Sequence, residues 1–544
     1  MSVKLTRRPE DLQEKEFDLL VIGGGIHGTC VARDAALRGL SVALIERGDF
    51  GSETSHNSLK LIHGGIRYLQ HLDLGRIRES VLERRFWLSC ARHLVRPIKF
   101  VIPTYGHGVR GALALGVATK LFGLLSWDRN RDLPESQHIG GGGLMSRADV
   151  IRDLPGIKQD RLTGAAYWHD GQVIDADRAM LEIVQSASTA GAVVCNYVSA
   201  KNLIRHVDTI CGVTAIDVIS GNELEIRAKV TINAAGPWAN EITSWIKSNR
   251  RVGRLSSLSK CMNIIVRRPE HLDLPDYGFG VISERKSDSL LDASGRMFFV
   301  TPWKGLSIIG TSHLPCSENP DDVSFTNKDI DDFLDEVNAA YPFRLTSSDV
   351  LYCYGGLTPA EEGTRRGQVK RARHGEIIDH LRDDSVDGLI TLIGVKFTTA
   401  RLVAERAVDL ALKKLGRDGF VCQTANELLV GATEGDAVSD HFWAQEDDNA
   451  GCIDMDGFES MIRDAVRNQM AMKISDIIDR RTDLAEMGHV TRDILKICAN
   501  TIGSEQDWTA NRRQAELEQA LKQYKLIAKD SADTGNLRST PQPS

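Results

Sequence analysis

The chain has 544 residues, enough for two or three domains and a large hydrophobic core. Hydrophobic residues make up 42% of it and charged residues 26%, as in an ordinary soluble globular protein. The net charge of −7 argues against a general nucleic-acid-binding protein, and the ten cysteines form no C-x-x-C pair, which argues against a zinc site or a disulfide framework.

The N-terminal segment is polar and contains acidic residues, so it lacks the apolar stretch of a secretion signal. No uninterrupted apolar run is long enough to cross a membrane. We therefore expect a cytoplasmic protein with no bound metal and no nucleic-acid partner.

Residues 17–46 predict a strand–helix–strand unit that binds a dinucleotide. A buried apolar run leads into Gly23, Gly25 and Gly28, and a second apolar run ends at Glu46. Gly23 permits a tight turn, Gly25 lets the backbone approach a pyrophosphate, and Gly28 lets helix and strand pack closely. The helix N-terminus attracts the phosphates, and Glu46 can accept hydrogen bonds from the adenosine ribose.

A helix predicted over residues 109–127 has an apolar stripe that suits a membrane surface. The stripe consists of Leu113, Val117, Leu121, Leu124 and Leu125. The residues expected near the headgroups are Arg110, Lys120 and Trp127. The alternative is a helix buried in the core or at a subunit interface.

The cofactor domain is predicted to be discontinuous along the chain. An apolar run ends in a turn at Ala235 and Gly236, and a third run, residues 389–393, ends at Gly394. A nicotinamide dehydrogenase usually completes its dinucleotide domain without such interruptions. The layout therefore indicates a flavoprotein that binds FAD rather than NAD.

The expected fold class is α/β, α+β overall, with three kinds of domain. The discontinuous Rossmann-like FAD-binding domain is expected to occupy residues 14–105, 176–250 and 371–430. Residues 106–175 form the apolar helix and an insertion, and residues 251–370 an antiparallel-sheet substrate domain. Residues 431–528 form a C-terminal helical domain, and residues 529–544, rich in Ser, Thr and Pro, a disordered tail.

Several segments together resemble the FAD-dependent glycerol-3-phosphate dehydrogenases, within the D-amino-acid-oxidase-like flavoproteins. The matching segments are residues 23–28, 54–70, 232–239, 298–313, 392–401 and 469–484. The string KLIHGGIRY within residues 60–68 is the most specific of them. The resemblance implies FAD as the cofactor and oxidation of a small phosphorylated polyol.

The resemblance also implies roles for individual residues. The positions expected to bind the substrate are Arg67, Tyr68, Lys396 and Thr358. Further positions expected to contact FAD are Thr54, Ser55, Ser58, Lys60, Leu61 and Thr398. Arg67 and Lys396 supply the cationic donors that a phosphate dianion requires.

Three positions depart from the family pattern. Thr358 stands where the family has Arg, His313 where it has Asp, and Asn263 where it has His. The phosphate end therefore matches while the reacting end is altered. Arg365 and Arg366 are candidates to replace the missing charge, or they belong to a solvated loop.

The expected reaction is oxidation of sn-glycerol-3-phosphate to dihydroxyacetone phosphate, with hydride transfer to flavin N5. His313 and His63 are the candidate proton acceptors, because the pKa of a free imidazole suits that task. The alternatives are a different phosphorylated or phosphonate alcohol or amine, and a non-catalytic flavin-binding paralogue. Quinone or oxygen takes the electrons, the inner membrane face is the expected attachment site, and a homodimer is left open.

Overall fold

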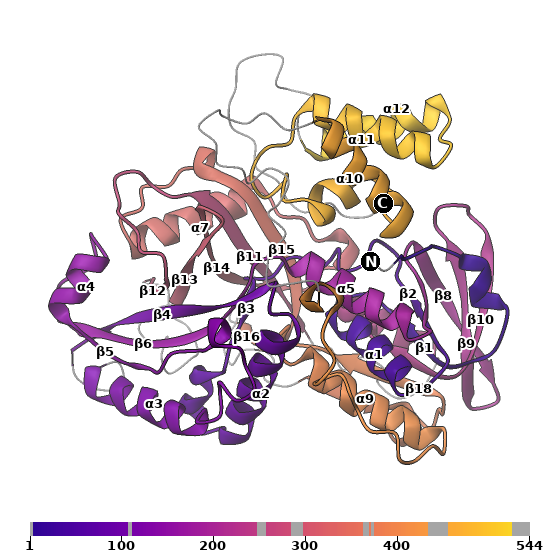
Figure 1. Ribbon diagram of the computed structural model, residues 1–544, viewed down its shortest axis with the longest axis horizontal. Helices are drawn as coiled ribbons and strands as arrows, with labels where there is room; N and C mark the ends of the chain where they lie inside the picture. The colour runs from indigo at the N-terminus through magenta and orange to yellow at the C-terminus, as the bar shows by residue number, and fades with distance from the viewer. Residues whose placement is uncertain are drawn as a thin grey trace.

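Two β-sheets and a C-terminal group of helices make up the protein (Figure 1). The structure is a computed structural model, and it describes residues 4–106, 111–246, 257–283, 297–362, 369–371, 375–433 and 455–524. The predicted tail at residues 529–544 lies outside the described residues, as do Arg110, Arg365 and Arg366.

The first sheet is the dinucleotide-binding sheet predicted around Gly23. Its strand order is β17 (Glu376–Asp379), β18 (Leu389–Ile393), β10 (Glu223–Asn233), β1 (Phe17–Ile22), β2 (Val42–Ile45) and β7 (Val193–Cys195). From β18 to β7 all neighbours pair in parallel, and β17 is antiparallel to β18. The β8 (Val198–His206) and β9 (Thr209–Asp217) hairpin extends β10. The strands β1, β10 and β18 come from three distant parts of the chain and run in the same direction. Their carboxyl ends therefore lie on the same side of the sheet.

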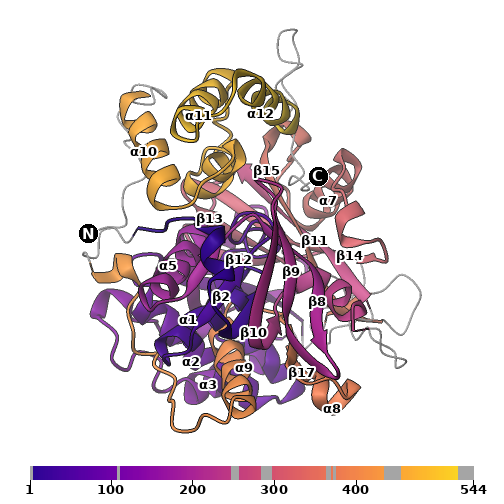
Figure 2. The same cartoon turned by 90° about the vertical axis from the view of Figure 1, so that its right-hand side faces the viewer.

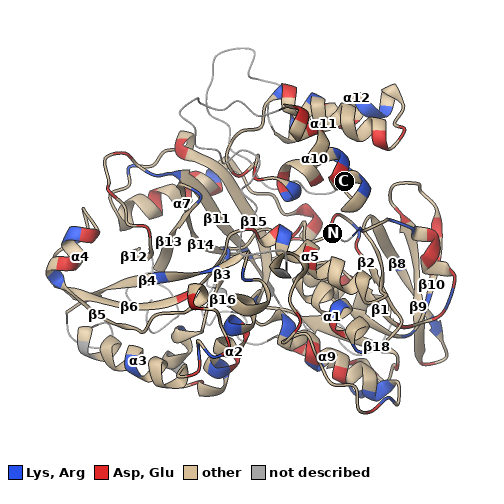
Figure 3. Ribbon diagram, in the orientation of Figure 1, with Lys and Arg blue, Asp and Glu red and all other residues tan. Residues whose placement is uncertain are grey.

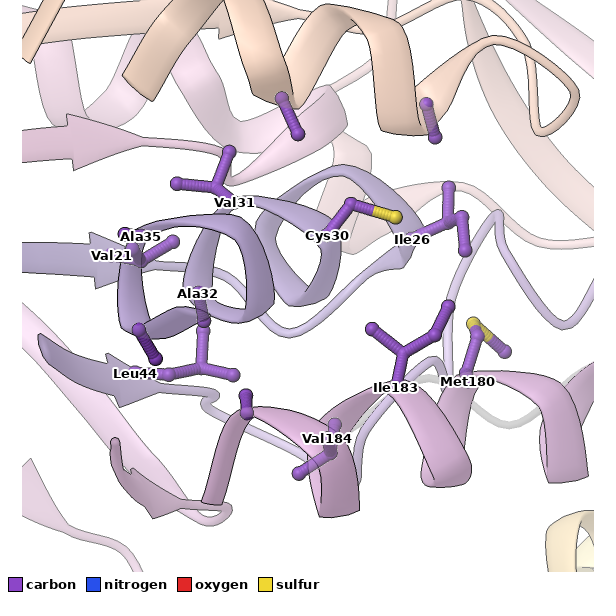
Figure 4. Packing of buried hydrophobic residues seen from close by; sticks show 14 of the residues in the cluster. Val21, Ile26, Cys30, Val31, Ala32, Ala35, Leu44, Met180, Ile183 and Val184 are labelled. Atoms are coloured by element: carbon purple, nitrogen blue, oxygen red, sulfur yellow. The ribbon is translucent and has the colours of Figure 1, made fainter. Parts of the chain in front are cut away.

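Helix α1 (Ile26–Leu37) packs against this sheet and lies between two other helices (Figure 4). Its small residues, such as Ala32 and Ala35, allow close approach to the strands and to α5 (Ala176–Thr189). Helix α9 (Ala400–Lys414) packs on the other side of α1. The burial of this helix fixes its N-terminus, and the glycine turn before it, relative to β1.

The second sheet is antiparallel apart from the β12–β4 pair. Its main order is β16 (Val369–Arg371), β15 (Val350–Glu362), β11 (Ser257–Arg267), β14 (Leu306–Cys316), β13 (Met297–Trp303), β12 (Gly278–Ile282), β4 (Val95–Tyr105), β6 (Leu162–Val173) and β3 (Leu61–Ile62). Strand β5 (Gly143–Ser146) pairs with β6. This sheet therefore includes strands from residues 61–173, which the sequence-based division placed outside the substrate domain.

The remaining helices cover the sheets and form the C-terminal domain. The helices around the sheets are α2 (Leu74–Cys90), α3 (Ala112–Leu125), α4 (Arg147–Asp153), α6 (Ala239–Ser244), α7 (Asn327–Ala340) and α8 (His380–Asp384). The C-terminal domain contains α10 (Met455–Asn468), a π-helix (Asp476–Arg481), α11 (Arg492–Glu505) and α12 (Ala510–Gln523). Its helices lie together at one end of the molecule (Figure 2). The predicted fold class is confirmed, and within the described ranges no helix has the length and apolarity that crossing a bilayer requires.

Candidate active site

A cavity of about 750 Å³ extends from the glycine turn after β1 to the second sheet. This volume lies within the range of small-molecule and cofactor sites. The predicted site residues that line it are Gly23, Gly25, Glu46, Thr54, Ser55, Ser58, Leu61, His63, Arg67, Tyr68, Ala235, Gly236, His313, Thr358, Gly394, Lys396 and Thr398. Residues from all three discontinuous segments therefore meet around one space.

The glycine turn leaves its backbone open to a ligand. Gly23 has φ +106°, a conformation that residues with a side chain rarely adopt. A Cβ atom on Gly28 would collide with the carbonyl oxygen of Gly23. Gly28 does not line the cavity; its role is the close packing of α1 against the turn. Gly25 is the N-cap of α1, so the N–H groups and the positive end of the helix dipole face this region.

Glu46 directly follows β2 beside the same turn. Its carboxylate accepts hydrogen bonds from the backbone N–H groups of Gly24 at 2.6 Å and Gly48 at 2.7 Å. Burial raises the pKa of Glu46, and these two hydrogen bonds partly offset that effect. An acid fixed at the end of β2 is the group that recognises an adenosine ribose in dinucleotide-binding folds. The glycine cradle, the helix N-terminus, Glu46 and the cavity volume together fit FAD.

The loop between Glu46 and Leu61 is held by the C-terminal domain. Asp49 has no exposed side-chain surface and lies 2.8 Å from Nε of Arg480 and 2.9 Å from Nη1 of Arg481. At the other end of the loop, Nζ of Lys60 lies 3.1 Å from Oε1 of Glu486. The side chain of Lys60 therefore faces the C-terminal domain, and this residue does not line the cavity, although we predicted it as a cofactor contact.

A group of cations gathers around Tyr68 at one end of the cavity. Nζ of Lys396 lies 4.1 Å from the centre of the Tyr68 ring, and the guanidinium carbon of Arg76 lies 5.1 Å from it. Burial, together with the charges of Arg76 and Arg67, lowers the pKa of Lys396 from 10.5 to about 7. Arg67 and Lys396 line the cavity, whereas Arg76 lies outside its lining and pairs with Asp73 at 3.1 Å. Two cations that face one space are suited to bind an anion. Arg76 belongs to no recognisable motif, so its place beside Tyr68 could not be predicted.

Buried polar contacts fix the backbone that carries Arg67 and Tyr68. The N–H of Gly64 donates to Oδ1 of Asp170 at 2.6 Å, and Nη1 of Arg84 lies 2.5 Å from the same oxygen. Arg84 and Asp170 are both buried. Gly65 has φ +81° and precedes the short helix that carries Arg67. The twin glycines therefore shape the turn, and the Arg84–Asp170 pair anchors it.

His63 lies between the cofactor segments and the cation group. Its backbone N–H donates to Oγ1 of Thr398 at 3.2 Å, and its ring centre is 6.1 Å from that of Tyr68. A second histidine, His27, also lines the cavity, and burial lowers its pKa to about 4. A Cβ atom on Gly394 would collide with the ring of His27, so the glycine makes room for it. His27 lies inside the glycine motif, and that position places its side chain next to the cofactor segments.

Strands of the second sheet form a further part of the cavity wall. His313 of β14 and Thr358 of β15 line it together with Cys261 and Asn263 of β11. Nδ1 of His313 lies 3.1 Å from Sγ of Cys261, and Oδ1 of Asn263 accepts a hydrogen bond from Oγ1 of Thr311 at 2.7 Å. The three positions that depart from the family pattern are thus neighbours in space. Cys261, which no motif marks as a site residue, also belongs to this group.

The chain is similar to known flavoproteins in sequence and in fold. The profile of the FAD dependent oxidoreductase family matches residues 18–410. A glycerol-3-phosphate dehydrogenase of Synechocystis sp. is 34% identical over 430 residues, which cover 78% of this chain and 74% of that protein. The mitochondrial glycerol-3-phosphate dehydrogenase of Saccharomyces cerevisiae is 31% identical over 77% of this chain and 67% of that protein. The crystal structure of the glycerol-3-phosphate dehydrogenase from Bacillus halodurans complexed with FAD has a similar fold, with a TM-score of 0.70, 23% identity, and coverage of 95% of this chain and 96% of that one.

Proposed function

The chain belongs to the family of FAD-dependent oxidoreductases, and from that premise we propose that it oxidises sn-glycerol-3-phosphate to dihydroxyacetone phosphate. The observation that carries the proposal is the pair of cations, Arg67 and Lys396, that lines the cavity that fits the cofactor, with Arg76 close to the ring of Tyr68. A phosphate dianion is the ligand that such a group stabilises best. The names of the curated relatives support the same substrate.

The protein residues divide into three roles in this proposal. The glycine turn and Glu46 hold FAD, which accepts a hydride from the alcohol carbon when bound. Arg67 and Lys396 bind the phosphate and so position the alcohol within the cavity. His313 or His63 takes the hydroxyl proton, because a neutral imidazole is a base at physiological pH.

A different phosphorylated or phosphonate alcohol or amine is the second candidate substrate. The observation that favours it is the end of the cavity formed by Thr358, His313 and Asn263, where the family pattern has Arg, Asp and His. Anaerobic flavin bleaching by a panel of substrates distinguishes the two. Rapid bleaching by sn-glycerol-3-phosphate supports the main proposal, whereas bleaching only by another anion supports the second.

We also propose that the enzyme attaches to the inner membrane face and passes its electrons to a quinone. The exposed face of α3 is apolar apart from Lys120 (Figure 3). Val117, Leu124 and Trp127 are 60%, 69% and 73% exposed. Leu121 and Leu125, which the predicted stripe also included, are half-buried, so the exposed face is narrower than expected. Exposed apolar groups beside a cation suit a bilayer interface.

Co-sedimentation with anionic liposomes tests this attachment. Leu124→Asp should release the enzyme from the vesicles while its flavin content stays unchanged. Val207→Asp is the matched control, because Val207 is 77% exposed on the turn between β8 and β9, far from α3 (Figure 1). A wild-type enzyme that never sediments with vesicles, and that forms peroxide stoichiometrically, would instead be an oxidase that uses oxygen.

A further inference from the structure

Four polar side chains meet on adjacent strands at the second-sheet end of the cavity. Sγ of Cys261 lies 3.1 Å from Nδ1 of His313 and 3.1 Å from Oγ1 of Thr358. Oγ of Ser259 lies 3.2 Å from the same imidazole nitrogen. The strand register explains the group, since Cys261 pairs with His313 across β11 and β14, and Ser259 pairs with Thr358 across β11 and β15.

Cys261 differs from the other cysteines of the described chain in its surroundings. Among the cysteines in the described part of the chain, Cys261 alone lines the cavity. Cys261 and Asn263 are two residues apart on β11, so their side chains share a face, and the intervening Met262 points into the core of the second sheet. The sulfur therefore lies among the groups expected to surround the reacting carbon.

The contacts of this sulfur are those of an activated nucleophile. A thiol within hydrogen-bond reach of an imidazole can transfer its proton to that ring, and the thiolate is the reactive form. A hydroxyl such as that of Thr358 can donate a hydrogen bond to the resulting anion. An Arg at position 358, as the resemblance predicted, would place a permanent charge here instead. Thr358 and His313, which stand where the resemblance predicted an arginine and an acid, are thus both in contact with the thiol of Cys261.

We propose that Cys261, with His313 as its proton acceptor, is the nucleophile of a second activity, the oxidation of a small phosphorylated aldehyde to the acid. The inference rests on the proposed function, because it uses the same anion site and the same FAD. The aldehyde carries the phosphate that Arg67 and Lys396 bind. Arg67, Lys396 and Cys261 line the same cavity, so an aldehyde bound through its phosphate shares that space with the sulfur.

The proposed reaction has three steps, which are addition of the thiol, hydride transfer and hydrolysis, and each step conserves atoms and electrons. Sγ of Cys261 bonds to the carbonyl carbon, and the carbonyl oxygen takes the proton that His313 removed from the thiol. The product is a thiohemiacetal, whose carbon carries the hydrogen and hydroxyl that enzymes acting on CH–OH oxidise. That carbon loses a hydride to FAD, the oxidant, and the hydroxyl loses its proton to His313, which leaves a thioester. Water then breaks the C–S bond, which releases the carboxylic acid and restores the thiol.

The first test detects the covalent adduct rather than turnover. The holoenzyme is mixed anaerobically with glyceraldehyde 3-phosphate, quenched in acid, and analysed by peptide mass spectrometry. We expect the mass of the acyl group on the Cys261 peptide, and its release as a hydroxamate by hydroxylamine. Cys261→Ser should give no adduct, whereas Cys211→Ser, a matched control at a partly exposed cysteine outside the cavity, should give the wild-type adduct.

The second test measures the role of His313. Alkylation of Cys261 by iodoacetamide in the holoenzyme should slow by about 100-fold in His313→Gln, the size of effect expected from loss of a base. Equal alkylation rates in wild type and variant would overturn the pairing. Flavin content measured for each variant shows whether the cavity is still formed.

The outcomes separate this inference from the proposed function. Bleaching of the wild-type flavin by sn-glycerol-3-phosphate, with no bleaching and no adduct from the aldehyde, overturns the inference alone. Bleaching by the aldehyde that persists in Cys261→Ser also overturns it. Flavin that stays oxidised with both compounds overturns the proposed function as well.

Discussion

The affinity of the anion site should depend on pH through Lys396. The pKa of Lys396 is about 7 in the unliganded protein, against an ordinary value of 10.5. A bound dianion favours the charged amine and raises its pKa toward the ordinary value. Below pH 7 the amine is already charged, whereas above pH 7 binding must take up a proton. The affinity is therefore highest near or below pH 7 and falls as the pH rises.

The size of the effect follows from the two pKa values. Half of the amines are charged at pH 7 and about one in a hundred at pH 9, so KM should rise about 50-fold over this interval. The inhibition constant of sulfate, which keeps two negative charges throughout, should rise in parallel. Lys396→Arg is the matched control, because an arginine remains charged and its profile should be flat. A wild-type KM that is constant between pH 7 and 9 would refute the reasoning.

Three further predictions concern the cofactor, the C-terminal domain and the substrate. Gly28→Ala should yield protein without flavin, read from its visible spectrum, because the new Cβ collides with the turn, whereas Gly75→Ala, where nothing lies within 4 Å, should keep a full complement. Asp49→Asn removes the buried carboxylate that Arg480 and Arg481 share, although Arg480 keeps Asp476, and should destabilise the protein by about 3 kcal/mol in urea-induced flavin release, unlike Asp149→Asn at an exposed ion pair. Arg67→Ala should raise KM about tenfold rather than more, because Arg67 is exposed, and unchanged kinetics would remove it from the site.

Features of the site that depend on local sequence could be predicted. The turn at Gly23 and Gly25 and the acid Glu46 follow from the order of strand, helix and strand, because consecutive elements of such a unit are neighbours in space. The string that carries Arg67 and Tyr68 could be placed beside them by its resemblance to a family.

Features that depend on contacts between distant segments could not be predicted. Lys60 lies within the most specific motif, yet its side chain pairs with Glu486 of the C-terminal domain. The contact between Cys261 and His313 depends on the register of two strands, and no periodicity in the sequence reveals which residues face each other. The parallel pairing of β4 with β12 likewise joins segments far apart in the chain, so the extent of the second sheet was underestimated.

An anaerobic titration of the purified protein with sn-glycerol-3-phosphate tests the central proposal most directly. We expect a yellow protein whose visible flavin absorbance is bleached as one equivalent of substrate is added per flavin, with dihydroxyacetone phosphate as the product. A protein whose flavin is reduced by dithionite but stays oxidised with sn-glycerol-3-phosphate would contradict the proposed function.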